Sequence, residues 1–289
     1  MQVQATTGVP EIDRLAGGII SGDNIVWEVD SGVPVERLVA SFLAACAGEQ
    51  STVIYVSFNS SPQTITNKYA SLMPKPDFLL VDCFSSGKGN NDKVFLDFFK
   101  GFEDGAPQAP VRLENPADPG SLEELLIKLG SRGQGSVRYM FDSLTGMLDL
   151  WRDEESVVRL FGHICPRLYD LNTIACWLLE KGAHSPSFLA KIRHITQVVF
   201  DVAVSRGVHS LTVRKAGNRC CESVGIPQRL VIGEQAISVA VETREGRELG
   251  LLTRMGEALG SALDPHAFFE QAMEAMANEL GMVRKMREG

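Results

Sequence analysis

The strongest constraint on the fold of this chain is a set of short apolar runs separated by segments of helical periodicity. The runs are NIVWEV, STVIYVSF, DFLLVDC, VRYMFD and NTIACWLLE. Each is shorter than a typical buried helix. Runs that are apolar on both faces suit strands covered on both sides of a sheet. Helical patterns lie at residues 35–48, 62–72, 94–102, 121–129 and 155–170. The alternation predicts an α/β domain, with a mostly parallel sheet flanked by helices.

The pattern changes after about Thr196. QVVFDVAVS, VHSLTVRKA, QRLVIG and AISVAVE alternate apolar and polar residues and are joined by short polar turns, which predicts an antiparallel C-terminal extension of the same sheet. One domain is therefore expected at residues 1–242. Residues 243–289 carry apolar side chains at intervals of three and four, which predicts a tail of two amphipathic helices. Packing onto the domain, dimerisation and a lead-in to a further domain all remain open for this tail.

Charge and cysteine content exclude several classes of protein. The chain has 36 acidic and 28 basic residues, so its surface repels phosphate backbones and nucleic acid is not an expected partner. No signal segment or membrane span is evident, which predicts a cytoplasmic protein. The six cysteines show no C-x-x-C spacing, and we expect buried, reduced thiols. Cys220 and Cys221, adjacent in a polar loop, form the one pair that could be redox-active, although neighbouring residues bridge only with strain.

The junction EVDSGVPVERL follows the first strand and leads into the first long helix. In nucleotide-binding proteins a glycine-rich loop at this place directs backbone amides at phosphate, a lysine neutralises the charge and a hydroxyl holds Mg²⁺. This junction contains a single glycine, a proline and a glutamate instead.

The surrounding sequence resembles KaiC-like proteins of the RecA superfamily. The segment TGVPEIDRLAGGIISGDNIVWEV resembles the opening of that family, VIYVSFNSSPQTI its second strand and turn, and YMFDSLTGM its magnesium-side strand. LLEKGAHSPSFLAKIRHITQVVFDV and LTVRKAGN resemble the late strands that face the neighbouring subunit's nucleotide. The resemblance spans Thr7 to about Ala216 and implies a RecA-like, P-loop NTPase fold. The tail looks only loosely like the helical lead-in to GAF-type sensor domains.

The resemblance implies that the phosphate loop, or Walker A motif, is degenerate. Val29 and Pro34 stand where the family has its first and last glycines, and Gly32 is an internal glycine. Val35 stands at the lysine and Glu36 at the hydroxyl residue. Proline removes an amide, and a glutamate at the helix start repels the anion that this end of a helix would otherwise attract.

Other positions implied by the resemblance are also changed. Asn59 and Ser60 stand at the adjacent glutamates that polarise the attacking water, and neither can act as a base near neutral pH. Of the Lys-x-Arg pair that bridges subunits, Lys215 remains and Gly217 replaces the arginine.

Some candidate charges remain. Arg37 could stand in for the missing lysine, but we favour an ordinary outward-facing surface charge. Asp142 could bind magnesium through water or accept hydrogen bonds from the amides of the next turn, and we favour the structural role. Lys88 lies in SSGKGNND, which we interpret as a flexible surface loop at the ligand-binding edge of the sheet. Glu180, Lys181 and His184 are interpreted as structural or interfacial.

The leading hypothesis is a non-catalytic, pseudo-ATPase KaiC-like protein with a regulatory or scaffolding role in signalling. We expect no catalytic residue, no metal site and no cofactor, and a partner, either like subunits or a signalling protein, bound through the sheet edge and the tail. The alternative is a residual ATP-binding protein or slow ATPase with Mg²⁺, in which Arg37, Lys88 or Lys215 supplies the charge. DNA binding is a third possibility, which the acidic balance disfavours. The candidate positions of the degenerate nucleotide site are Gly32, Val35, Glu36, Arg37, Asp142 and Lys215.

Overall fold

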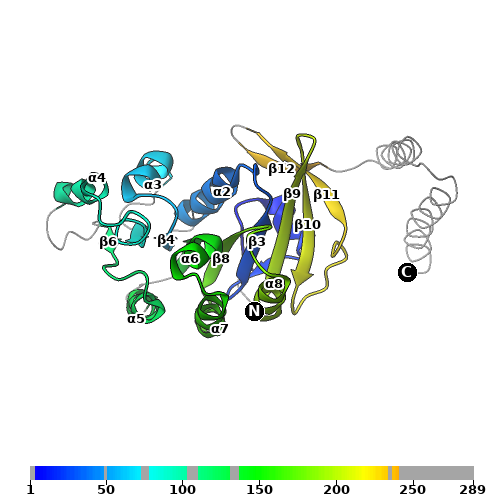
Figure 1. Ribbon diagram of the computed structural model, residues 1–289. Coiled ribbons are helices and arrows are strands. Elements are labelled where there is room, and N and C mark those ends of the chain that lie inside the picture. Colours follow the sequence, from blue (N-terminus) through cyan, green and yellow to red (C-terminus); the bar gives the residue numbers. More distant parts are fainter. Residues whose placement is uncertain are drawn as a thin grey trace, which may run out of the picture. The chain divides into compact units, whose positions relative to one another are not determined.

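The structure is a computed structural model, and it describes residues 4–48, 51–72, 78–102, 110–130, 137–233 and 236–240. The chain divides into two compact units after Ala240, close to the boundary predicted at residue 242. The first unit, Met1–Ala240, is an α/β body (Figure 1). The two helices predicted for the tail lie outside the described residues.

Ten strands of the described residues form one sheet in the order β12-β11-β10-β9-β3-β8-β7-β4-β5-β6. The pairs from β9 to β6 are all parallel, whereas β9 to β12 pair antiparallel. The predicted fold class is therefore confirmed, including the C-terminal extension. The strands are β3 (Asn24–Val29), β4 (Thr52–Ser57), β5 (Phe78–Asp82), β6 (Val111–Arg112), β7 (Val137–Asp142), β8 (Ile174–Glu180), β9 (Val198–Ser205), β10 (Val208–Ala216), β11 (Pro227–Ile232) and β12 (Ile237–Ala240). A separate hairpin pairs β1 (Gln4–Ala5) with β2 (Ile19–Ile20).

Both faces of the sheet are covered, which explains the continuous apolar runs. All six residues of β3 are buried. Ile25 and Trp27 join the core beneath α2 (Val35–Gly48), whereas Val26 joins the core on the opposite face. Figure 1 shows α2 on one side of the strands, and α7 (Glu154–Asp170) and α8 (Pro186–Ile195) on the other. Such alternation buries every side chain of a central parallel strand.

Several predicted helices differ from the observed ones. The predicted α2 is observed at the same residues, but α3 (Pro62–Tyr69) ends before residue 72. Residues 94–102 do not form one helix, because α4 (Lys93–Leu96) gives way to the 3₁₀ turn η1 (Asp97–Gly101). Three helices were not predicted, namely α1 (Pro10–Leu15), α6 (Leu144–Trp151) and α8.

The sequence Ser121-Leu122-Glu123-Glu124 has the pattern of a capping box, which predicts that Ser121 caps the helix, and this prediction is wrong. Helix α5 (Pro119–Gly130) begins before this residue, so Ser121 lies in the first turn. Its amide donates a 2.9 Å hydrogen bond to the Asp118 carboxylate. Asp118 therefore supplies the side chain that satisfies the free amides at the start of this helix.

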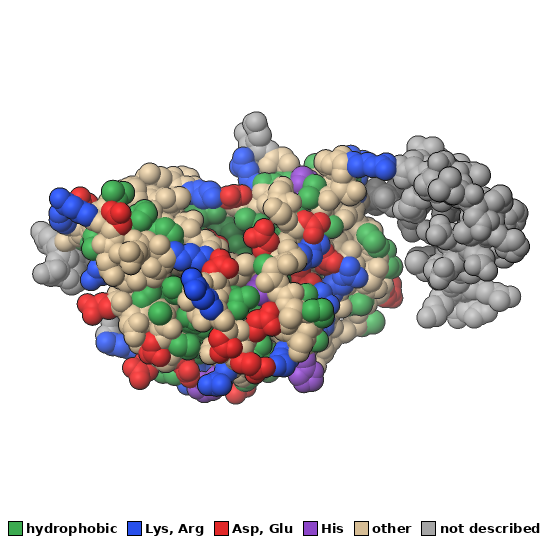
Figure 2. Space-filling model, in the orientation of Figure 1, with side chains coloured by type: hydrophobic (Ala, Val, Ile, Leu, Met, Phe, Trp, Pro, Cys, Tyr) green, Lys and Arg blue, Asp and Glu red, His purple; other side chains and the backbone are tan. Residues whose placement is uncertain are grey.

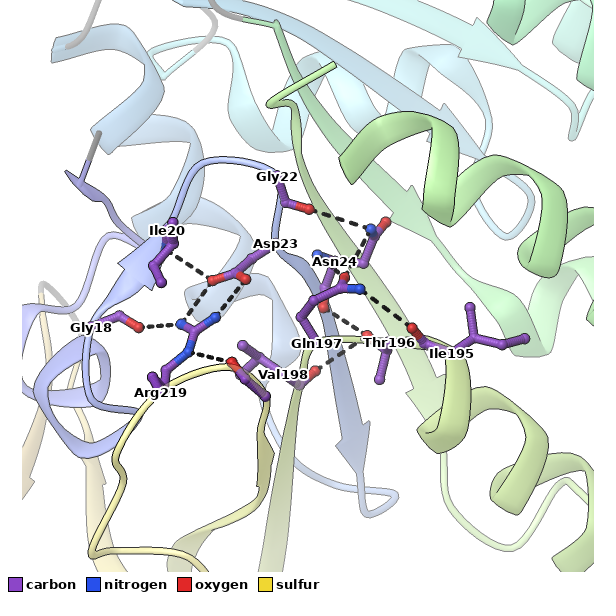
Figure 3. Close-up of polar contacts among 11 residues, drawn as sticks. Gly18, Ile20, Gly22, Asp23, Asn24, Ile195, Thr196, Gln197, Val198 and Arg219 are labelled. Carbon is purple, nitrogen blue, oxygen red and sulfur yellow. Dashed lines mark hydrogen bonds and ion pairs between the residues drawn. The ribbon is translucent and has the colours of Figure 1, made fainter. Parts of the chain in front are cut away.

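A buried polar cluster ties the loop after β10 to the turn before β3 (Figure 3). The Arg219 guanidinium forms two hydrogen bonds to the Asp23 carboxylate, at 2.9 and 2.6 Å, and a third to the Gly18 carbonyl. The side chains of Arg219 and Asp23 are only 6% and 2% exposed. Beside them, Thr196 donates to the Asn24 carbonyl at 2.6 Å. These contacts join segments nearly two hundred residues apart in the sequence.

Candidate functional site

The carboxyl ends of β3, β7 and β8 meet at one edge of the sheet, where ligands of parallel sheets usually bind. A pocket of about 170 Å³ lies at this edge. Three of the predicted positions, Gly32, Val35 and Asp142, line it together. The full lining is Val29, Asp30, Ser31, Gly32, Val33, Val35, Asn59, Asp142, Ser143, Leu178, Leu179 and Glu180.

The backbone of the loop between β3 and α2 is largely bonded to the protein itself. The Asp30 amide donates to the Val202 carbonyl of β9 at 2.9 Å. The Val33 amide donates to the Asp30 carbonyl at 3.1 Å, and the Val35 amide donates to the Val33 carbonyl at 2.8 Å. Gly32 has a φ of 94°, which allows the turn that this tight path requires. These three amides are therefore already bonded within the chain and are not available to a phosphate.

The side chain of Lys181 holds the same loop to the sheet. Its Nζ atom lies 2.7 Å from the Asp30 carboxylate and 2.6 Å from the Asp201 carboxylate. Asp201 also accepts hydrogen bonds from Arg214, at 2.5 and 2.8 Å, and Asp30 accepts one from the Val204 amide at 3.0 Å. Lys181 is therefore already paired with two carboxylates of the chain, which gives it a structural role.

This network lowers two carboxyl pKa values. Burial alone would raise the pKa of Asp201, but the hydrogen bonds from Lys181 and Arg214 outweigh it and hold the pKa below its usual value. The pKa of Asp30 is lowered in the same way, because the bonds from Lys181 and the Val204 amide outweigh the effect of burial. Both groups are therefore negatively charged at neutral pH.

The lowered pKa of Asp201 predicts a loss of stability in acid. As the pH falls below the ordinary value of 3.8, the unfolded chain takes up a proton before the folded chain does. The stability that this carboxylate contributes is therefore complete above that pH and is lost as the pH falls through the folded pKa. We expect Asp201→Asn to make the free energy of unfolding less dependent on pH below 3.8, as measured by urea titrations at several pH values. Identical slopes for variant and wild type would contradict this.

Glu36 and Arg37 lie on the first turn of α2. The Glu36 carboxylate accepts a 2.9 Å hydrogen bond from Lys68 of α3. Burial alone would raise the pKa of Glu36, but the hydrogen bond and charge of Lys68 outweigh this effect. The pKa of Glu36 is therefore lower than usual, and the group is charged at neutral pH. Arg37 is exposed, as we expected from its sequence position. The start of α2 thus carries its own carboxylate, already paired with a lysine.

Asp142 ends β7 and is held by side chains. Its carboxylate accepts hydrogen bonds from the Tyr55 hydroxyl at 2.9 Å and from Asn59 Nδ2 at 3.5 Å. The expectation that amides of the next turn bind it is wrong, because the Gly146 amide donates to Ser143 Oγ instead. Burial raises the pKa of Asp142 despite these hydrogen bonds. The carboxylate is therefore already engaged by side chains of the chain itself, which is consistent with the structural role.

Lys88 reaches the edge of the pocket. Its Nζ atom donates to Asn59 Oδ1 at 2.9 Å and to the Asp149 carboxylate at 2.7 Å. The interpretation of residues 85–92 as a simple surface loop is therefore incomplete, since Lys88 anchors this loop. Asn59 in turn donates to Ser143 Oγ at 2.9 Å. A chain of polar contacts thus runs along one side of the pocket.

Lys215 does not join the other predicted positions. Its Nζ atom donates to the carbonyls of Arg193 and His194, at 2.7 and 2.9 Å. These are the last carbonyls of α8, where a cation also complements the helix dipole. Lys215 is absent from the residues that line the described pocket, and burial lowers its pKa.

Sequence reasoning missed several residues of the site. Lys68 and Tyr55 carried no local signal, because their partners lie far away in the sequence. Glu28 did carry one, since a charged residue inside an apolar strand needs a partner when buried. Its carboxylate is bound at both oxygens by Arg193, at 2.7 and 2.6 Å. A hydrogen bond between distant segments also fixes the end of β8, where the Glu180 amide donates to Thr145 Oγ1 at 2.9 Å.

The strand order and the position of the site edge are those of a RecA-like α/β fold. A KaiC-like protein from the hyperthermophilic archaeon Pyrococcus horikoshii OT3 has a similar structure, with a TM-score of 0.58 and 13% sequence identity. The match covers 83% of this chain and 100% of that one. At such low identity the likeness shows the fold alone, which is KaiC-like. No family model matches the sequence, and no curated protein matches it.

The described part of the chain contains no group of three or more His, Cys, Asp or Glu side chains that could hold a metal ion. None of the helices within the described ranges is both long and apolar enough to cross a membrane.

Proposed function

We propose that this chain is a non-catalytic, KaiC-like regulatory or scaffolding protein whose degenerate phosphate loop does not bind nucleotide. The single observation that carries the proposal is the Lys181 bridge between Asp30 and Asp201, at 2.7 and 2.6 Å. In a working phosphate loop the cation faces the phosphates. In this protein Val35 stands at the position of that lysine, and the lysine that contacts the loop, Lys181 after β8, neutralises the loop's own carboxylate.

Electrostatics at the pocket also disfavour a triphosphate. Asp30 and Asp142 line it with Glu180, and Glu36 stands beside it on the first turn of α2. Two unit charges about 4 Å apart near a protein surface interact by about 4 kcal/mol, so each ionised carboxylate near a phosphate is a substantial penalty. Lys181 and Lys68 are each already paired with carboxylates of the chain, so part of their charge is neutralised before a phosphate arrives.

The residue at the position of the catalytic glutamate also cannot act as a base. Asn59, which stands where the resemblance places a catalytic glutamate, donates to Ser143 and accepts from Lys88. An amide so held cannot take a proton from water near neutral pH. Asp142 is the remaining carboxylate on that side, and the Tyr55 hydroxyl already donates to it.

We further propose that the protein acts in the cytoplasm, in signalling, by binding like subunits or a protein partner. Among the described strands β12 is the last on this side of the sheet, and its outer edge, which pairs with none of them, is the proposed contact for a partner strand. The tail is the second proposed contact. Figure 2 supports the exclusion of nucleic acid, because acidic and basic side chains are interspersed over the described surface of this face. Nucleic-acid binding instead needs a clustered basic patch.

The proposal is tested by nucleotide binding and turnover. We expect calorimetric titration of the full chain with MgATP, and separately with ADP, to give no heat of binding. Phosphate release should stay at the background of the buffer. Micromolar affinity for either nucleotide would contradict the proposal, as would phosphate release that is abolished by Asp142→Asn.

A second candidate function, residual nucleotide binding, is favoured by one observation only. Lys88 Nζ lies 2.9 Å from Oδ1 of Asn59, a residue that lines the pocket, so Lys88 is the remaining candidate cation at its edge. If ATP binds, Lys88→Ala should weaken it, whereas Lys215→Ala should not, because Lys215 caps α8. The two variants therefore form a matched pair.

A further inference from the structure

Two of the six cysteines differ from the rest in their accessibility. Cys46, Cys83, Cys165 and Cys176 are fully buried, whereas Cys220 is exposed and Cys221 is half-buried, and none of the six forms a disulfide. Burial also raises the pKa of Cys83, Cys165 and Cys176, which keeps them protonated and unreactive. The reactive thiols of the described residues are therefore two neighbours in the sequence.

The loop that carries this pair is fixed at several points. Cys221 Sγ donates a 2.9 Å hydrogen bond to the Leu15 carbonyl. The Cys220 carbonyl packs so closely on Gly17 that a Cβ atom there would lie 2.5 Å from it. The preceding residue, Arg219, is held in the buried pair with Asp23 (Figure 3). Cys220 and Cys221 are thus neighbours in sequence on a loop that the body holds in place, and at least the Cys220 side chain is exposed to solvent.

We propose that Cys220 and Cys221 form a dithiol site that chelates a thiophilic trivalent arsenic centre. Soft thiolate ligands select soft centres, and two sulfurs on one fixed loop bind one acceptor atom without bringing a second loop into place. A disulfide would require the two sulfurs to lie about 2.05 Å apart, which strains adjacent residues. One larger atom between the sulfurs avoids that requirement.

The reaction needs neither oxidant nor reductant. With phenylarsine oxide, two sulfur–arsenic bonds form and the arsenic–oxygen bond breaks, and the two thiol protons leave with the oxygen as one water molecule. Arsenic remains trivalent throughout. Cys221 Sγ gives up its hydrogen bond to the Leu15 carbonyl as it becomes a ligand.

The test uses the native full chain, phenylarsine oxide as the probe and intact-mass spectrometry as the readout. We expect one phenylarsenic adduct per chain, which survives excess monothiol and is removed by a dithiol such as dimercaptopropanol. Cys220→Ser and Cys221→Ser should each lose the monothiol-resistant adduct completely. The matched control Ser223→Ala, which changes a side chain in the same loop, should keep it.

Absence of the adduct on the native chain would overturn the proposal, as would its persistence in both single-cysteine variants. Circular dichroism establishes that each variant is folded. Cys220→Ser alters an exposed side chain, so it remains an informative variant even if Cys221→Ser does not fold. The outcome is independent of nucleotide binding, because the dithiol lies outside the residues that line the pocket.

Discussion

Replacing Arg219 by alanine is expected to lower the free energy of unfolding by about 3–5 kcal/mol, because it leaves the Asp23 carboxylate charged and buried without its partner. Asp23 is 2% exposed, so water cannot replace the guanidinium without opening the structure. The remaining contact to this carboxylate, from the Ile20 amide at 2.8 Å, does not neutralise it. The variant also removes the donor to the Gly18 carbonyl. Urea unfolding followed by tryptophan fluorescence measures the change.

Arg214→Ala is the matched control for this measurement. Arg214 also pairs with an aspartate, but its side chain is 49% exposed, and Asp201 keeps its contact with Lys181. We therefore expect a loss of about 1 kcal/mol or less. Equal losses for Arg214→Ala and Arg219→Ala would show that burial does not decide the strength of these pairs.

Trp177→Ala is expected to cost about 3–5 kcal/mol, the usual range for removing a large aromatic side chain from a core. Trp177 is fully buried in β8, where its ring stacks on Phe141 and meets Phe161 edge-on. Its indole nitrogen donates to Asn24 Oδ1 at 3.3 Å. Thermal or urea unfolding of the variant measures the loss.

Trp177→Phe separates packing from hydrogen bonding at the same position. Phenylalanine keeps an aromatic face against Phe141 but removes the donor to Asn24, so a smaller loss than in Trp177→Ala is expected. If both variants lose the same amount, the buried hydrogen bond rather than the ring packing dominates at this site.

The sequence predicted the elements whose patterns are long and local. The β3 and α2 segments were found because six buried residues in a row and a fourteen-residue periodic helix leave little ambiguity. Residues 94–102 were not found correctly, because α4 and η1 bury none of their residues and packing does not support one longer helix. The helices α6 and α8 are only eight and ten residues long, so their apolar periodicity is short. A single capping serine, Ser143 or Ser185, marks the start of each, and one such residue is a weak signal in the sequence.

The site was predictable where residue type alone decides the chemistry. A proline and a glutamate in the loop after β3 already argued against phosphate, and the loop lies where it was expected. The partners of its charges were not predictable, since Lys68 comes from α3 and Lys181 from the end of β8. Lys215 was misplaced for the same reason, because its contact with α8 depends on tertiary structure. Contacts between distant segments carry no periodic signal in the sequence.

The internal bond from Lys181 to Asp30 has a consequence for how such a subunit could take part in a regulated assembly. A ligand shifts a conformational equilibrium only if it binds one state better than another. Under the function proposed above, the shape of the loop is set by this ion pair, and ATP and ADP would give no such difference in binding. Such a subunit would not respond to the ratio of ATP to ADP, and any signal that it passes on would come from its abundance or from what docks on it.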